Sequence, residues 1–114
     1  MLPEEIRREI LSRLVEGGNI RKVIVFGSYA CGAPGLDSDI DLLVVTDDNS
    51  TPRSFEENME HYHRVSSLLR EIKKRMPVDL IVHTKPMHEE FMRQGSMFAK
   101  EIAECGEVLY EKSH

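Results

Sequence analysis

The fold of this chain is decided by the stretch Gly27-Ser28-Tyr29-Ala30-Cys31-Gly32, together with Asp39-Ile40-Asp41-Leu42-Leu43-Val44-Val45 seven residues later. The first part is a glycine-containing turn that follows the apolar run 23–26. Glycine lets the backbone approach a ligand closely, and the first N–H groups of a helix attract phosphate. We therefore expect Gly27 and Ser28 to bind phosphate groups between a strand and a short helix. Taken alone, this part better fits an ordinary strand-to-helix turn with a serine N-cap, and only the aspartates that follow favour the phosphate site.

The second part places two carboxylates on one strand. Side chains alternate along a strand, so Asp39 and Asp41 point to the same face. Two anions about 4 Å apart repel by about 4 kcal/mol at an effective dielectric near 20. A divalent cation between them turns that repulsion into attraction, so the pair predicts a magnesium site beside a triphosphate site. Two solvated aspartates at a strand edge are the alternative.

A third carboxylate, Asp79, interrupts the apolar run 78–82, which reads as another strand. If this strand neighbours the strand at 39–45, Asp79 converges with Asp39 and Asp41. Three such carboxylates can hold two Mg²⁺ ions, one on a triphosphate and one shared with an attacking hydroxyl. Asp79 is then best placed to position and help deprotonate the acceptor. The alternative is an exposed aspartate at a strand end.

The remaining elements follow from periodicity and turn residues. The capping box of Ser54 and Glu57 opens a helix that Pro77 ends. The segments 33–38 and 47–52 read as loops, and 108–110 as a final strand or an apolar tail. The other helices and strands are predicted at 3–16, 22–26, 28–31, 39–45, 78–82, 86–94 and 97–105. This order predicts an α/β (α+β) fold with a small mixed β-sheet flanked by helices, in one domain over 1–114.

Composition narrows the class of protein further. A chain of 114 residues suits one core, and its net charge of −5 argues against broad binding of nucleic acid. Two cysteines without a CxxC pair indicate neither a disulfide framework nor structural zinc. The charged N-terminus and the lack of a long apolar run predict a cytoplasmic protein that does not enter a membrane.

Basic residues are weaker candidates for the site. Arg53 and Lys85 flank elements near the presumed site, and either could reach a phosphate. The run 73–75 reads as a solvated helix end favoured by the helix dipole, or as a surface for an acidic partner.

Several other residues have plain structural interpretations. Ser38 either orients Asp39 or has no special role. His61 and His63 diverge on a helix, which predicts surface positions for them rather than metal ligation. The methionines, Phe55, Phe91 and Phe98 are most simply core residues.

The combined motif resembles the signature of the DNA polymerase β-like nucleotidyltransferase superfamily. The matching residues are Gly27-Ser28, Ala30 and Gly32, then Asp37-Ser38-Asp39-Ile40-Asp41-Leu42-Leu43-Val44. The short chain is most similar to the minimal nucleotidyltransferase (MNT) group.

This resemblance implies a nucleotidyltransferase fold whose Gly27 and Ser28 bind the nucleotide. It also implies that Asp39, Asp41 and Asp79 are catalytic and bind two Mg²⁺ ions. Proteins of this group often act as antitoxins of helical HEPN-type toxins, and some transfer AMP from ATP to a toxin tyrosine. The implied role is therefore the antitoxin of a pair similar to type VII toxin–antitoxin systems.

The resemblance leaves one departure and two alternatives. Cys31 stands where such proteins frequently have a basic residue, which leaves less positive charge near the triphosphate. One alternative is an antitoxin that blocks its partner by occlusion without catalysis. The other is a nucleotidyltransferase for small molecules such as aminoglycosides, for which a chain of this size would need to dimerise. A homo-oligomer is compatible with either.

Overall fold

The computed structural model describes residues 2–31 and 39–112, apart from the side chain of Cys31. The predictions for Gly32, for the loop 33–38 and for Ser38 lie outside these residues. The elements are α1 (Glu4–Gly17), β1 (Ile20–Phe26), α2 (Ser28–Cys31), β2 (Ile40–Thr46), α3 (Phe55–Leu68), α4 (Arg70–Lys73), β3 (Val78–His83), α5 (Lys85–Gln94), α6 (Met97–Cys105) and β4 (Glu107–Glu111).

The strands form one mixed sheet in the order β3-β2-β1-β4, as the α/β (α+β) interpretation requires. β1 is antiparallel to both β2 and β4, while β2 and β3 are parallel. The C-terminal residues 108–110 therefore belong to an edge strand rather than to an apolar tail. Within residues 2–31 and 39–112, no helix is long and apolar enough to cross a membrane.

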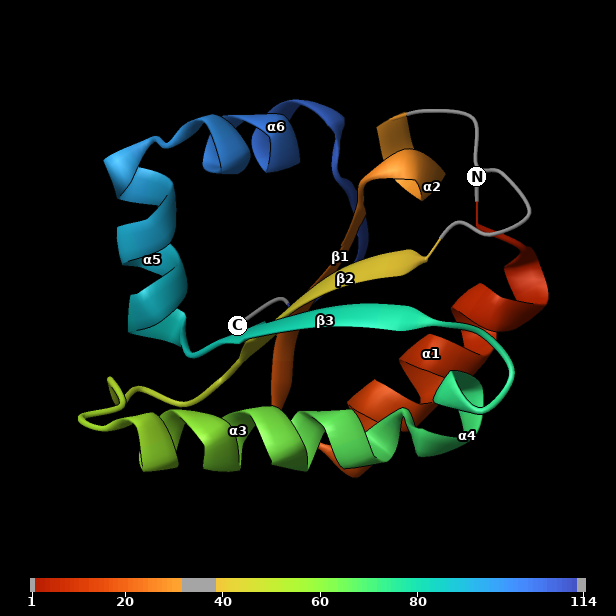
Figure 1. Ribbon diagram of the computed structural model, residues 1–114, viewed down its shortest axis with the longest axis horizontal. Helices are drawn as coiled ribbons and strands as arrows, with labels where there is room; N and C mark the ends of the chain where they lie inside the picture. The colour runs from red at the N-terminus through yellow and green to blue at the C-terminus, as the bar shows by residue number, and fades with distance from the viewer. Residues whose placement is uncertain (1, 32–38, 113–114) are drawn as a thin grey trace.

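The two faces of the sheet are covered by different helices. Helices α1, α3 and α4 lie on one side and α5 and α6 on the other (Figure 1). The first face carries the larger core, where Ile10, Leu42 and Leu69 are fully buried. The second carries a smaller core of Ile24, Phe26, Leu43 and Ile102, with Ile81 and Phe91 packed against it. Alternation along each strand assigns odd and even residues to different faces, so it also decides the face of every polar residue.

The helix predicted to run from Ser54 to Pro77 is interrupted at Leu69. Its start agrees with the prediction, because Ser54 Oγ accepts a hydrogen bond from the backbone N–H of Glu57. At Leu69 the backbone N–H donates to the carbonyl of Ser66, three residues back, and α4 starts at the next residue. This tighter turn ends α3 while Leu69 itself stays fully buried.

Two of the three phenylalanines expected in the core are exposed, so that prediction is wrong for them. Phe55 is 73% exposed and Phe98 38% exposed. Met97 is 88% exposed, against the same prediction for the methionines. The helical period finds the face of a helix that is apolar, but it does not show whether another element covers that face.

Candidate active site

The turn after β1 and the carboxylate of Asp41 lie in direct contact. Gly27 has φ +72°, in the left-handed region that favours glycine. A Cβ at Gly27 would lie 2.1 Å from Asp41 Oδ2 and 3.0 Å from its Cγ. Asp41 is also the register partner of Phe26, the residue before the turn. Glycine is therefore required here by backbone conformation and by the space that the carboxylate occupies.

Asp41 and Asp79 are register partners on the neighbouring parallel strands β2 and β3. Partners in register project to the same face, here the face that carries α5 and α6. Leu80 and Val82 belong to the larger core on the opposite face, so Asp79 lies where strand alternation predicted it. Asp39 immediately precedes β2 and is exposed. The predicted adjacency of the two strands is thus confirmed, while the roles of the three aspartates stay predictions.

The electrostatic surroundings of Asp41 are unfavourable to its charge. Burial raises the pKa of this half-buried carboxyl above its ordinary value, and the negative charges of Asp79, Asp39 and Glu101 raise it further. Glu101 lies on α6 and was not singled out from the sequence, since an exposed glutamate on a helix gives no distinguishing signal. A cation bound here would relieve the repulsion among these groups.

The residues present fit Mg²⁺ by their chemistry. Magnesium prefers carboxylate oxygens, and Asp39, Asp41 and Asp79 supply them beside a glycine backbone. Their side chains are not gathered around one point, however: among the described residues, no group of three or more His, Cys, Asp or Glu side chains is arranged to hold a metal ion. The predicted convergence is therefore present in strand register and face but not in side-chain placement.

The turn itself resembles the predicted phosphate site in its local structure. Ser28 opens α2 and is partly exposed, and the backbone N–H of Ala30 donates to the carbonyl of Gly27 over 3.0 Å. Asp37, Ser38, Gly32 and the side chain of Cys31, all used in the sequence comparison, lie outside the described part of the chain.

Arg53 and Lys85 are not near this site, so the expectation that either reaches a phosphate there is wrong. The aspartates lie at the start of β2 and β3, whereas Lys85 follows the end of β3 and Arg53 precedes α3 (Figure 1). The backbone N–H of Lys85 donates to the carbonyl of Asp48, beyond the end of β2. At about 3.3 Å per residue, a strand of seven residues separates its two ends by about 20 Å.

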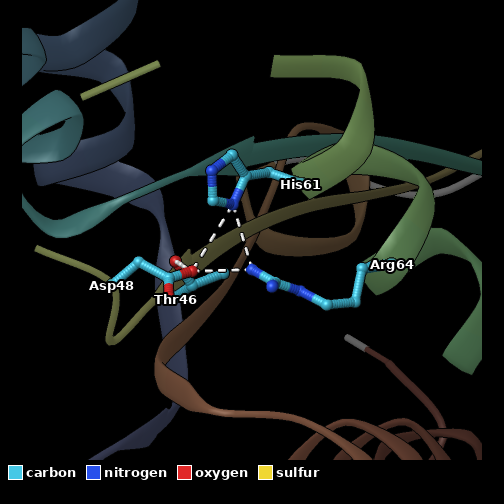
Figure 2. Close-up of polar contacts among 4 residues, drawn as sticks. All are labelled: Thr46, Asp48, His61 and Arg64. Atoms are coloured by element: carbon cyan, nitrogen blue, oxygen red, sulfur yellow. Dashed lines mark hydrogen bonds and ion pairs between the residues drawn. The ribbon is translucent and has the colours of Figure 1, made fainter. Parts of the chain in front are cut away.

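A second group of polar residues lies at that opposite end. Asp48 Oδ2 accepts hydrogen bonds from Thr46 Oγ1 at 3.0 Å and Arg64 Nη2 at 2.7 Å, and lies 3.4 Å from His61 Nδ1 (Figure 2). Sequence reasoning missed this cluster, because its members come from β2, the following loop and α3. His61 belongs to it rather than to the free surface, while His63 is exposed as expected.

Comparison with known proteins identifies the family. The family described as "Polymerase beta, Nucleotidyltransferase" matches residues 8–114. The chain belongs to this polymerase beta nucleotidyltransferase family. It is therefore a nucleotidyltransferase, and the polar cluster at the start of β2 and β3 is its candidate active site.

Individual relatives agree with the family. The nucleotidyltransferase is 32% identical over 92 residues to the "Putative protein adenylyltransferase MJ1379" of Methanocaldococcus jannaschii, covering 81% of this chain and 85% of the relative. Its fold is similar to that in the crystal structure of a toxin-antitoxin with AMP-PNP, with a TM-score of 0.60 and 20% identity. A mutant of the toxin-antitoxin MntA-HpeT gives a TM-score of 0.59 and 18% identity. Both matches cover 94% of this chain and 74% of the other.

Proposed function

We propose that this nucleotidyltransferase transfers AMP from ATP to a hydroxyl group of a partner protein, a HEPN-type toxin, and so acts as its antitoxin. The acceptor is a tyrosine hydroxyl in this proposal. We further propose that residues 1–114 form a single nucleotidyltransferase domain that works in the cytoplasm.

One observation carries the catalytic part of the proposal. Asp41 contacts the Gly27 turn and is in register with Asp79 on the same face of the sheet. The glycine turn and two carboxylates from neighbouring strands thus lie on the same face of the sheet. Phosphoryl transfer needs this combination, because its catalysis depends on positioning and on neutralising charge.

The proposed reaction assigns a role to each predicted site residue. Gly27 and Ser28 bind the triphosphate, and Asp39 and Asp41 would hold its metal. The acceptor oxygen forms a bond to the α-phosphorus, and the bond from that phosphorus to pyrophosphate breaks in line. Pyrophosphate leaves with the bonding electrons. The hydroxyl proton passes to a carboxylate, for which the exposed Asp79 is best placed.

Asp39, Asp41 and Asp79 are the residues that would hold Mg²⁺. When bound, two such ions would neutralise phosphate charge and lower the pKa of the acceptor hydroxyl. They would also stabilise the charged form of Asp41, whose pKa is raised by burial and by its acidic neighbours.

The toxin partner rests on similarity. The relative from Methanocaldococcus jannaschii bears the name of a protein adenylyltransferase, and both similar solved structures are toxin–antitoxin complexes. One contains the ATP analogue AMP-PNP. The other carries two Asp-to-Glu substitutions two positions apart, the same residue type and spacing as Asp39 and Asp41.

The test uses the chain, ATP labelled on the α-phosphate, magnesium and the product of the adjacent gene. We expect the label to appear on a tyrosine of the partner and to require magnesium. Asp39→Asn should abolish the label while the circular dichroism spectrum stays that of the parent. An Asp39→Asn protein that labels the partner at the parental rate would refute the mechanism.

The same experiment separates the alternatives. A stable complex that neutralises the partner without label supports occlusion and contradicts the proposal. Label on an aminoglycoside but not on protein supports the small-molecule alternative.

A further inference from the structure

Helix α6 stands beside the candidate active site. Its residues Ala99 and Ile102 are buried, and Ile102 belongs to the same small core as Phe26. Glu101, one position before Ile102, lies close enough to Asp41 for its charge to raise the pKa of that carboxyl. The side of α6 that carries Phe98 and Glu101 therefore borders the region around Asp41, since residues three apart share a helix face.

The ring of Phe98 packs against two other aromatic rings but is partly exposed to solvent. Its ring packs edge to face on Phe26, with ring centroids 5.4 Å apart and planes at 74°. It makes a second edge-to-face contact with Phe91 at 5.8 Å and 76°. Two such contacts fix the orientation of the ring, while 38% of the residue is exposed. Because Phe98 contacts Phe26, which immediately precedes Gly27, its ring lies close to the turn that we propose binds phosphate.

The charges around the site favour different positions for the phosphates and for the base of a nucleotide. Glu101 is an anion, so its side of the site disfavours phosphates. A neutral base meets no such penalty and can stack on an aromatic side chain. With the phosphates at Gly27 and Ser28, as proposed above, the base belongs towards α6.

We propose that Phe98 is the residue on which the base of the bound nucleotide stacks, so that α6 forms the base-binding wall of the site. This inference rests on the proposed function, because it requires a nucleotide at the Gly27 turn. It gives a role to an aromatic ring that is exposed where a core position was expected.

The first test measures affinity rather than catalysis. Titration calorimetry with ATP and magnesium should show binding weakened about 5- to 150-fold in Phe98→Ala, the range expected from loss of one base stack. Inorganic tripolyphosphate, which has no base, should bind parent and variant equally. Phe98→Tyr should retain ATP binding, and Met97→Ala, an exposed neighbour on α6, serves as the matched control.

The second test is spectroscopic. The chain contains no tryptophan, so Phe98→Trp introduces a single tryptophan, whose fluorescence can be excited apart from that of the three tyrosines. ATP should quench it, whereas tripolyphosphate should not. Met97→Trp should respond to neither, because that position is 88% exposed.

The outcomes separate this inference from the proposed function. If the parent binds ATP and Phe98→Ala binds it equally well, the stacking role is refuted and the proposed function stands. If Phe98→Ala weakens tripolyphosphate as much as ATP, Phe98 only supports the fold and the inference is refuted. If the parent binds no ATP at all, the proposed function fails and the inference fails with it.

Discussion

Strand β2 has aspartates near both ends, and their surroundings are opposite. Near its start, Asp41 faces Asp79, and no ion pair within the described residues involves either of them. Just past its other end, Asp47 lies 2.5 Å from Lys112 Nζ and 3.5 Å from Arg21 Nη1. Asp48 accepts from Arg64 at 2.7 Å.

The pKa values of the two ends follow this contrast. Burial and neighbouring carboxylates raise the pKa of Asp41, whereas the hydrogen bond from Lys112 lowers the pKa of Asp47. The aspartates after the end of β2 are thus paired with basic side chains, whereas Asp41 near its start faces other carboxylates. Carboxylates arranged against their own electrostatics mark a place where a ligand is expected to complete the site.

Among the substitutions that compare the two ends of β2, Asp41→Asn should have the largest effect. We expect transfer of AMP to fall by about 10²- to 10³-fold, the range for removing one group that stabilises developing charge. The melting temperature should not fall, because the substitution removes repulsion from Asp79 and Asp39. Labelled-ATP assays and thermal unfolding measure the two effects. An Asp41→Asn protein that transfers AMP at the parental rate and melts at a lower temperature would contradict the contrast between the two ends of β2.

Replacing Gly27 tests the contact between the turn and the carboxylate. Gly27→Ala should cost about 1–2 kcal/mol for the left-handed backbone, and its Cβ should displace Asp41 and reduce ATP binding. Gly95→Ala is the matched control, since Gly95 has φ +63° but nothing within 4 Å of an added Cβ. Chemical denaturation and calorimetry should show similar losses of stability but a loss of binding only at Gly27. Equal binding by both variants would refute the contact.

At the other end of β2, Asp48→Asn should do the reverse of Asp41→Asn. It removes the charge that accepts from Arg64 and Thr46, so the free energy of unfolding should fall by about 1 kcal/mol. Transfer of AMP by the folded protein should stay at the parental rate. Urea unfolding and the labelled-ATP assay check both statements, and a folded Asp48→Asn protein without activity would break the division into two ends.

Magnesium should stabilise the folded protein by binding at the start of β2 and not at its other end. At a concentration ten times its dissociation constant, a ligand of the native state adds about 1.4 kcal/mol to the free energy of unfolding. We expect a rise in melting temperature with Mg²⁺ in the parent and in Asp47→Asn, but little or none in Asp41→Asn. A rise of the same size in all three proteins would place the ion elsewhere.

The smallest effect is on the pH dependence of the free energy of unfolding. Asp41 and Asp47 should change this dependence in opposite directions. The raised pKa of Asp41 gives stability that is complete below 3.8 and is lost as the pH rises through its folded pKa. The lowered pKa of Asp47 gives stability that is present above 3.8 and is lost as the pH falls through its folded pKa. The free energy of unfolding, measured with urea at several pH values, should therefore fall less with rising pH in Asp41→Asn than in the parent. In Asp47→Asn it should fall less with decreasing pH, and the remaining fall comes from the lowered pKa values of Glu9, Glu90 and His83. The same change in both variants would contradict these assignments.

Much of the local structure was predictable from sequence. Apolar runs and turn residues located the strands, and the Ser54 cap marked the start of α3. Strand alternation predicted the face of Asp79 because that rule needs no knowledge of distant residues. The break at Leu69 and the exposure of Phe98 were not predictable, since both depend on what packs against the helix.

The sequence by itself determined which residues are chemically unusual: a glycine turn and aspartates within apolar strands, where charge without compensation is costly. Only the tertiary structure decided which of those residues meet. It put β3 beside β2 with Asp79 opposite Asp41, brought Phe98 and Glu101 of α6 to the same region, and moved Arg53 and Lys85 to the far end. The physical reason is that strand order and helix docking depend on contacts between distant segments, which no local period encodes.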